Sequence, residues 1–302
     1  MQYNTTNRPI RMLPLLVCVV IAGCSAMRGP NDADRLIQSR QLTMQGMNAA
    51  QEGRADDAEA LFKQAIAICK VDERPHLQRA KLFWSQQKYD QAIQEMEEAV
   101  RLSAGEPSRR IQLGKMYLEL DRLAQAQGQA RRAISTGNSA AAWILRAQVL
   151  HRQQKLSEAL AAYQRALSAT PNQGALARQA QLAIADIYRE TNRSHLSLAV
   201  LDRWLEENPD LVAGKVLHRR GLALQSLQRH REAAICLSKA ARQEGNNAVL
   251  LYDLAQSQFQ SGDVIGARLS VQQALRIAPR MPQAINLAQR LEKEPPSIAR
   301  RP

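Results

Sequence analysis

Small side chains recur along this sequence at intervals of 33 to 38 residues. Three such series run in parallel, the second twelve and the third nineteen residues after the first. Two helices can pack closely only where both present small side chains. The spacing therefore predicts a helix pair that is repeated along the chain. The series are Gly46, Ala80, Gly114, Ala147, Ala185, Gly221 and Ala255; Ala58, Ala92, Ala126, Ala159, Ser197, Ala233 and Ala267; and Ala65, Ala99, Ala133, Ala166, Trp204, Ala240 and Ala274.

The composition agrees with an all-α chain. Aromatic residues are only 4% of the sequence, whereas a β-sandwich or barrel would contain more aromatic and β-branched residues. Gly and Pro, at 14 and 12 residues, are too few for a collagen-like or disordered chain, and 45% of the residues are hydrophobic.

The segment from Leu113 and Gly114 to Tyr117, followed by Ala126 and Ala133, resembles one unit of the tetratricopeptide (TPR) repeat family. With its first residue set at Pro107, the frame places further units along residues 39–281. The resemblance implies an all-α, right-handed α-solenoid of about seven helix-turn-helix units, in which helix A of each pair is followed by helix B. Units 1 to 7 start at Ser39, Glu73, Pro107, Ala140, Arg178, Gly214 and Ala248.

Three segments lie outside the repeats. Residues 282–291 continue the apolar pattern, and we expect a helix there that caps the last unit, since the terminal face of a solenoid must be covered. Residues 24–38 are polar and predict a flexible tether, and residues 292–302 predict a disordered tail.

Unit 5 departs most from the pattern. Trp204 fills a position that is otherwise always Ala, and Ser197 replaces another Ala. A tryptophan there is expected to push the helices apart or to turn outward, which would create a bend or a docking site. Neutral drift with local repacking is the alternative, and we favour it.

The N-terminus has the pattern of an export signal. Arg8 and Arg11 precede an apolar run over residues 12–22, which is too short to span a membrane and fits the core of a signal peptide. The run ends in Ile21-Ala22-Gly23-Cys24, which resembles the lipobox of bacterial lipoproteins. An ordinary secretory signal with an incidental cysteine is the alternative reading.

The lipobox resemblance implies that residues 1–23 are removed and that Cys24 carries the acyl chains, palmitate among them. Several acyl chains give stable membrane anchoring. Ser25 follows the cysteine. In many bacteria with two membranes a residue other than Asp at this place accompanies sorting to the outer membrane, so we expect a lipoprotein of the cell envelope that faces the periplasm.

The sequence contains no metalloprotease, serine-hydrolase, P-loop or dinucleotide-binding motif. None of the five histidines has metal-ligand spacing, and Cys69 and Cys236 lie far apart without a CxxC pair. We therefore expect no enzyme, no catalytic residue, no metal and no cofactor.

In the TPR family the A helices line a concave groove that binds extended peptides or partner helices. The frame assigns positions two, five, nine and twelve of each unit to that groove; packing between neighbouring A helices is the alternative role for each of them. In units 3 to 5 they include Leu118, Gln148, Gln179, Leu182 and Asp186. The candidate partner-binding residues are Arg74, Lys81, Trp84, Lys115, His151, Arg189, His218, Tyr252 and Phe259.

These features predict a lipid-anchored scaffold for protein–protein interactions in envelope assembly, similar to the TPR lipoproteins of pilus secretin assembly, outer-membrane protein insertion or peptidoglycan-enzyme regulation. The net charge of +13 supports an alternative, a binding module for an anionic polymer such as a polysaccharide or cell-wall glycan. Its basic residues are spread over all units without a dense run. We expect no small-molecule substrate, and the export signal argues against nucleic acid.

Overall fold

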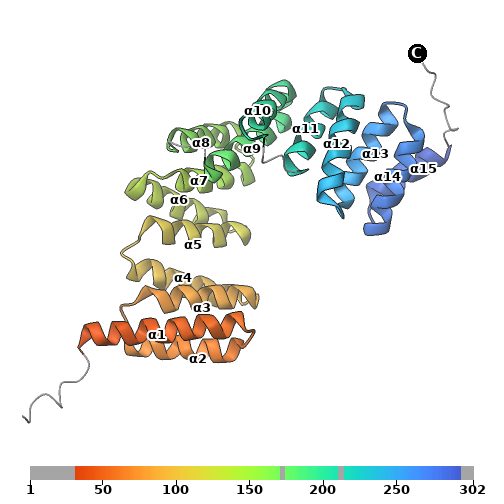
Figure 1. Ribbon diagram of the computed structural model, residues 1–302. Coiled ribbons are helices and arrows are strands. Elements are labelled where there is room, and N and C mark those ends of the chain that lie inside the picture. The colour runs from red at the N-terminus through yellow and green to blue at the C-terminus, as the bar shows by residue number, and fades with distance from the viewer. Residues whose placement is uncertain (1–30, 171–173, 210–213, 294–302) are drawn as a thin grey trace, which may run out of the picture. The chain divides into compact units, whose positions relative to one another are not determined.

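A computed structural model describes residues 31–170, 174–209 and 214–293. The predicted signal peptide, Cys24 and residues 294–302 lie outside these ranges. Every regular element of the described residues is a helix, and there are fifteen α-helices (Figure 1). The all-α solenoid fold predicted from the sequence is confirmed. The helices belong to two compact bodies, an N-terminal body that ends at Ser103 and a C-terminal body that begins at Ala104.

The N-terminal body contains two helix pairs. Helix α1 packs against α2, α3 packs against α4, and α3 also contacts both helices of the first pair. The bounds are α1 Asp32–Gln51, α2 Ala55–Ile68, α3 Glu73–Ser85 and α4 Tyr89–Leu102.

The C-terminal body continues the same arrangement with five pairs and a last single helix. Each A helix packs against its own B helix and against the next A helix. The bounds are α5 Pro107–Glu119, α6 Leu123–Gly137, α7 Ala140–Arg152, α8 Leu156–Ser168, α9 Ala175–Glu190, α10 Ser194–Glu207, α11 Gly214–Ser226, α12 His230–Glu244, α13 Ala248–Gln260, α14 Val264–Ile277 and α15 Pro282–Lys293.

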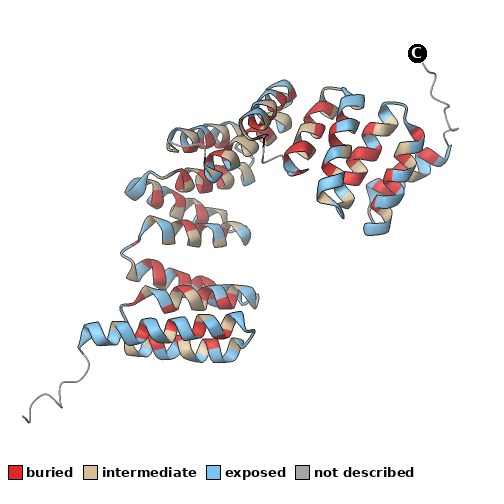
Figure 2. Ribbon diagram, viewed as in Figure 1, coloured by how far each residue is buried: buried red, intermediate tan, exposed pale blue. Residues whose placement is uncertain are grey.

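The small residues predicted to lie between helices A and B are buried in every pair. In Figure 2 the buried residues lie on the facing sides of the helices and the exposed residues on the outer sides. Helices α3, α5, α7, α11 and α13 begin at the predicted starts of their units. Helix α15 spans the segment expected to cap the last unit and buries Ala284, Leu287 and Leu291 in one cluster with Val271.

Helix α1 begins at Asp32, so the second half of the predicted tether is helical rather than flexible. The Asn31 side chain accepts a hydrogen bond from the Asp34 N–H at 2.8 Å, which caps the helix. Asp32 and Asp34 lie in the first turn, where negative charge stabilises a helix. These local signals extend the helix although its first residues are exposed to solvent.

The turn between helices A and B has the same backbone conformation in all seven units. The fifteenth residue of each unit has a φ between 57° and 88°, in the left-handed region. Glycine occupies this place in two units and residues with a Cβ, which are less stable there, occupy it in five. The residues are Gly53, Gln87, Asp121, Gln154, Asn192, Gln228 and Gly262.

Trp204 does not turn outward; its side chain is buried, in agreement with the local repacking that we favoured from the sequence. It is only 4% exposed and belongs to a buried cluster with Leu201, Val216 and Ala185. The indole Nε1 is buried and has no hydrogen-bond partner among the described residues. Unit 5 therefore accommodates the large side chain by local packing.

Candidate functional site

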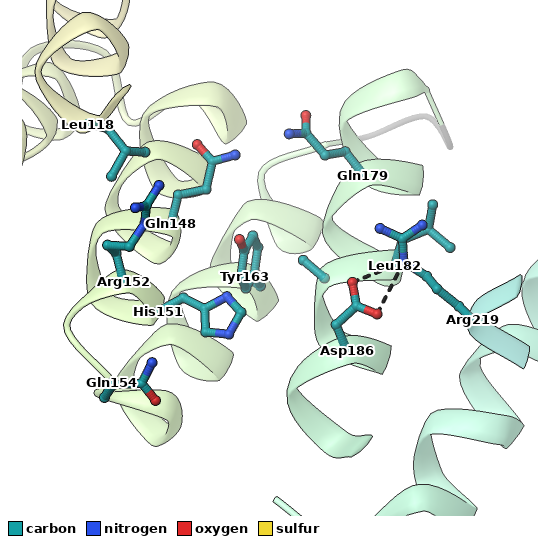
Figure 3. A pocket seen from close by; sticks show the side chains of 11 residues that line it. Leu118, Gln148, His151, Arg152, Gln154, Tyr163, Gln179, Leu182, Asp186 and Arg219 are labelled. Atoms are coloured by element: carbon teal, nitrogen blue, oxygen red, sulfur yellow. Dashed lines mark hydrogen bonds and ion pairs between the residues drawn. The ribbon is translucent and has the colours of Figure 1, made fainter. Parts of the chain in front are cut away.

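The A helices of the C-terminal body form a pocket with a volume of about 570 Å³ (Figure 3). Its lining comes from α5, α7, α9 and α11, together with one side chain from helix α8 and one from the turn before it. We call it the A-face pocket. It is lined by Leu118, Gln148, His151, Arg152, Gln154, Tyr163, Gln179, Leu182, Ala183, Asp186 and Arg219.

Most of the A-helix residues in this pocket stand at positions that the repeat frame assigned to the groove. The frame predicted Leu118 of α5, Gln148 and His151 of α7, and Leu182 and Asp186 of α9, and Gln179 completes this set. Side chains from three successive A helices thus meet, because each A helix packs against the next.

The sequence reading missed the other lining residues. Tyr163 comes from helix α8, where the frame treated it as a packing residue. Arg152 and Arg219 each follow a predicted groove position by one residue, and Gln154 lies in the turn after α7. A polar hydroxyl at a packing position that is otherwise apolar or Ala was the one signal that could have identified Tyr163.

The charged groups of the pocket are paired with one another or with neighbours. The Arg219 Nε donates to both carboxylate oxygens of Asp186, at 3.1 and 2.9 Å. The His151 Nε2 lies 2.7 Å from a Glu190 carboxylate oxygen. The Arg152 guanidinium lies 3.5 Å from the carboxylate of Asp121.

Tyr163 is 3% exposed, and no hydrogen bond joins its hydroxyl to any other described residue. In Figure 3 its side chain lies between His151 on one helix and Asp186 on another. Burial raises the pKa of this phenol, and the negative charges of Asp186 and Glu190 raise it further. The hydroxyl therefore stays protonated and can donate a hydrogen bond.

Of the other predicted residues in the C-terminal body, Lys115 is exposed on α5 and Arg189 is half-buried on α9. His218 is paired with Asp253 of α13, with its Nε2 2.6 Å from the carboxylate. Tyr252 and Phe259 pack against the last cluster of the body rather than at the A-face pocket. The guanidinium of Arg290, on the capping helix, lies 5.3 Å from the Phe259 ring centre.

Three predicted residues, Arg74, Lys81 and Trp84, lie on α3 of the N-terminal body. Arg74 and Lys81 are exposed, whereas Trp84 is half-buried and meets the ring of Tyr89 edge to face, with 5.0 Å between the ring centres. Position five is a packing position in units 2, 3 and 4, since Leu77, Ile111 and Ile144 are buried.

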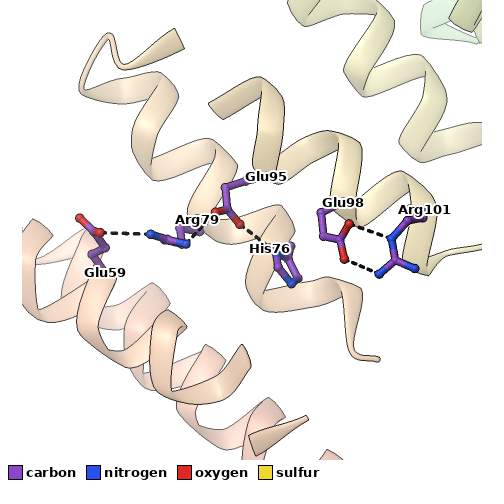
Figure 4. A network of polar contacts seen from close by, with 6 residues as sticks. All are labelled: Glu59, His76, Arg79, Glu95, Glu98 and Arg101. Carbon is purple, nitrogen blue, oxygen red and sulfur yellow. Dashed lines mark hydrogen bonds and ion pairs between the residues drawn. The ribbon is translucent and has the colours of Figure 1, made fainter. Parts of the chain in front are cut away.

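Near them, a polar network joins three helices of the N-terminal body (Figure 4). Arg79 of α3 donates to Glu59 of α2 at 3.3 Å and to Glu95 of α4 at 2.6 Å. His76 also contacts Glu95, at 2.8 Å. The hydrogen bond from Lys63 is the main cause that lowers the pKa of Glu59, despite partial burial, and the bond from Arg79 lowers it further. Because its charges are neutralised internally, this network stabilises the packing of the helices.

No group of His, Cys, Asp and Glu within the described ranges could hold a metal ion. Cys69 and Cys236 are buried free cysteines. In the part of the chain that the structure describes, no helix has both the length and the apolarity needed to cross a bilayer.

The tetratricopeptide repeat family matches residues 43–107 and again residues 218–282. The chain therefore contains tetratricopeptide (TPR) repeats in these two stretches. A second family, described as anaphase-promoting complex, cyclosome, subunit 3, matches residues 85–166 of the chain. No curated protein matches the sequence.

Several solved structures share the fold of this chain. A TPR protein from Parabacteroides merdae has 13% identity and a TM-score of 0.66, and the match covers 85% of this chain and 99% of that one. Pseudomonas aeruginosa pilF has 15% identity and a TM-score of 0.55, with 85% and 99% covered. Yeast Tom70 has 18% identity and a TM-score of 0.57, with 87% and 55% covered. TPR solenoids are typically non-catalytic scaffolds that present an extended concave binding surface.

Proposed function

We propose that this protein is a scaffold for protein–protein interactions and that the A helices of its C-terminal body bind an extended or helical segment of a partner. The A-face pocket is the observation that carries this proposal. It gathers predicted groove positions from three successive A helices, and its volume lies within the range of about 300–1,000 Å³ common for ligand sites.

We further propose that the scaffold is attached to the bacterial envelope by acyl chains on Cys24 and serves in envelope assembly at the outer membrane. The two arginines, the short apolar run and the residues before Cys24 support this attachment.

The alternative function, binding of an anionic polymer, would require cations that are free to neutralise the polymer's charges. In the A-face pocket the guanidinium groups of Arg219 and Arg152 already contact carboxylates of the same chain. This pairing favours a protein partner over a polyanion.

A photo-crosslinking amino acid tests the proposed surface. It replaces Gln148 or Gln179 in the full-length protein, in cells, and the control replaces Gln164, an exposed glutamine of helix α8 outside the pocket. We expect discrete protein adducts at 148 and 179 and none at 164. Equal adducts at all three positions would place the binding surface elsewhere.

A further inference from the structure

The A-face pocket has little capacity for another charge. Arg219 contacts the carboxylate of Asp186 and Arg152 contacts that of Asp121, while the His151 ring lies within hydrogen-bond distance of Glu190. A ligand charge beside the partly buried Arg219–Asp186 pair would have to break that pair or remain unpaired. Both are unfavourable in a partly desolvated site.

The uncharged polar side chains of the pocket, in contrast, are available to pair with a ligand. No hydrogen bond joins the side-chain amides of Gln148, Gln154 and Gln179 to other residues in the described part of the chain, and the same holds for the Tyr163 hydroxyl. The Tyr163 hydroxyl stays protonated and can donate a hydrogen bond to an acceptor on a ligand.

The hydrogen-bonding groups of the lining favour a polypeptide main chain. A glutamine amide offers one acceptor and two donors, and a peptide group offers the complementary donor and acceptor. Leu118 and Leu182 lie on different helices and add apolar surface beside the amides (Figure 3). The ring of Tyr163 is buried, so the lining lacks an open aromatic face for the stacking that a sugar would use.

We propose that the A-face pocket binds an uncharged stretch of extended peptide, whose main-chain amides pair with the side chains of Gln148, Gln154 and Gln179 and with the Tyr163 hydroxyl. This inference rests on the proposed function, because it assumes that the A helices of the C-terminal body bind a peptide. Contacts between neutral groups predict an affinity that depends little on salt.

The test selects ligands from a displayed library of random linear 12-residue peptides on the full-length protein. We expect enriched peptides with an uncharged centre and an affinity that changes less than about twofold between 50 and 500 mM NaCl. Replacing both Gln148 and Gln179 by Ala should weaken binding about tenfold. Methylating main-chain nitrogens at the centre of the peptide should weaken it similarly.

Two single substitutions form a matched pair. Gln154→Gly and Gln228→Gly each remove an amide from the same left-handed turn position, so both remove the same backbone strain, but only Gln154 lines the A-face pocket. We expect weaker peptide binding only for Gln154→Gly, while circular dichroism shows both variants folded.

The outcomes separate this inference from the proposed function. Enriched peptides with charged centres and salt-sensitive binding, still weakened by the Gln148 and Gln179 changes, would overturn the neutral pocket and leave the interaction surface intact. Peptides whose binding ignores both glutamines would overturn both. Competition by maltohexaose, a neutral oligosaccharide probe, would overturn the choice of a peptide.

Discussion

The side chain of Leu237 on helix α12 occupies the space in which a side chain at Gly221 of α11 would begin. A Cβ built on Gly221 would lie 2.5 Å from the Leu237 Cγ, and Leu237 is fully buried. Helices A and B of unit 6 can therefore approach this closely only because position 221 lacks a Cβ.

Gly221→Ala should destabilise the protein. Overpacking costs about 1–3 kcal/mol and exceeds the gain of about 1 kcal/mol from replacing a helical glycine. Gly128→Ala is the control, because a Cβ there meets nothing within 4 Å, and it should stabilise helix α6. Urea unfolding followed by circular dichroism measures both, and shifts in the same direction would contradict the packing described for Gly221.

Trp204→Ala should be strongly destabilising, although Ala occupies this position in the other units. The surrounding residues pack around the indole, so truncation leaves a cavity and costs about 3–5 kcal/mol. Trp143→Ala is the comparison, since Trp143 is half-buried, and it should cost less. Thermal unfolding distinguishes the two, and a small effect at 204 would indicate an outward side chain.

Tyr163 should make the folded state sensitive to alkali. Its pKa is raised above the ordinary 10.0 in the folded state, so above that pH the unfolded chain releases this proton before the folded chain does. The free energy of unfolding is therefore unaffected by this group below pH 10 and falls as the pH rises above it. Tyr163→Phe should lose less stability than the wild type between pH 8 and about pH 11, measured by urea midpoints. Equal losses in both proteins would contradict the raised pKa.

Gln87 occupies the left-handed turn of unit 2, with a φ of 62°. Gln87→Gly should stabilise the N-terminal body by up to about 1 kcal/mol, because glycine adopts this conformation without the Cβ penalty. Gln87→Val should do the opposite, since β-branched residues tolerate positive φ least. Chemical denaturation of both variants gives the comparison, and a stabilising valine would refute the turn conformation.

Cys24→Ser should move the protein from the membrane to the soluble fraction, because the thiol that would carry the lipid is lost. Cys18→Ser is the matched control, since Cys18 lies in the segment expected to be removed. Cell fractionation with immunoblotting reads out both. Retention of the Cys24 variant in the membrane would exclude the lipoprotein proposal.

The helix pairs could be predicted from the sequence because their contacts depend on residue size at fixed positions. Ala92 and Ala126, for example, are fully buried where the frame placed them. The early start of α1 was missed because it depends on the local cap at Asn31 rather than on the repeat. The orientation of Trp204 depends on how its neighbours repack, and that is not encoded in the spacing.

The pocket was predicted in part. The frame identified the helix face, including Gln148 and Asp186, but could not tell which stretch of that face is hollow. Tyr163 and Arg219 line the pocket from positions that the frame did not assign to the groove. The pairing of His218 with Asp253 also depends on the contact between two A helices.

The buried alanines have a consequence for how such a chain can diverge. They meet the packing requirement between helices A and B of one unit, as at Ala159 in unit 4, while separate contacts join each unit to the next. The outward positions of the A helices are then free to change one unit at a time. A unit from another chain with the same small residues and matching contacts to α6 and α9 could replace α7 and α8, and it would bring its own recognition chemistry.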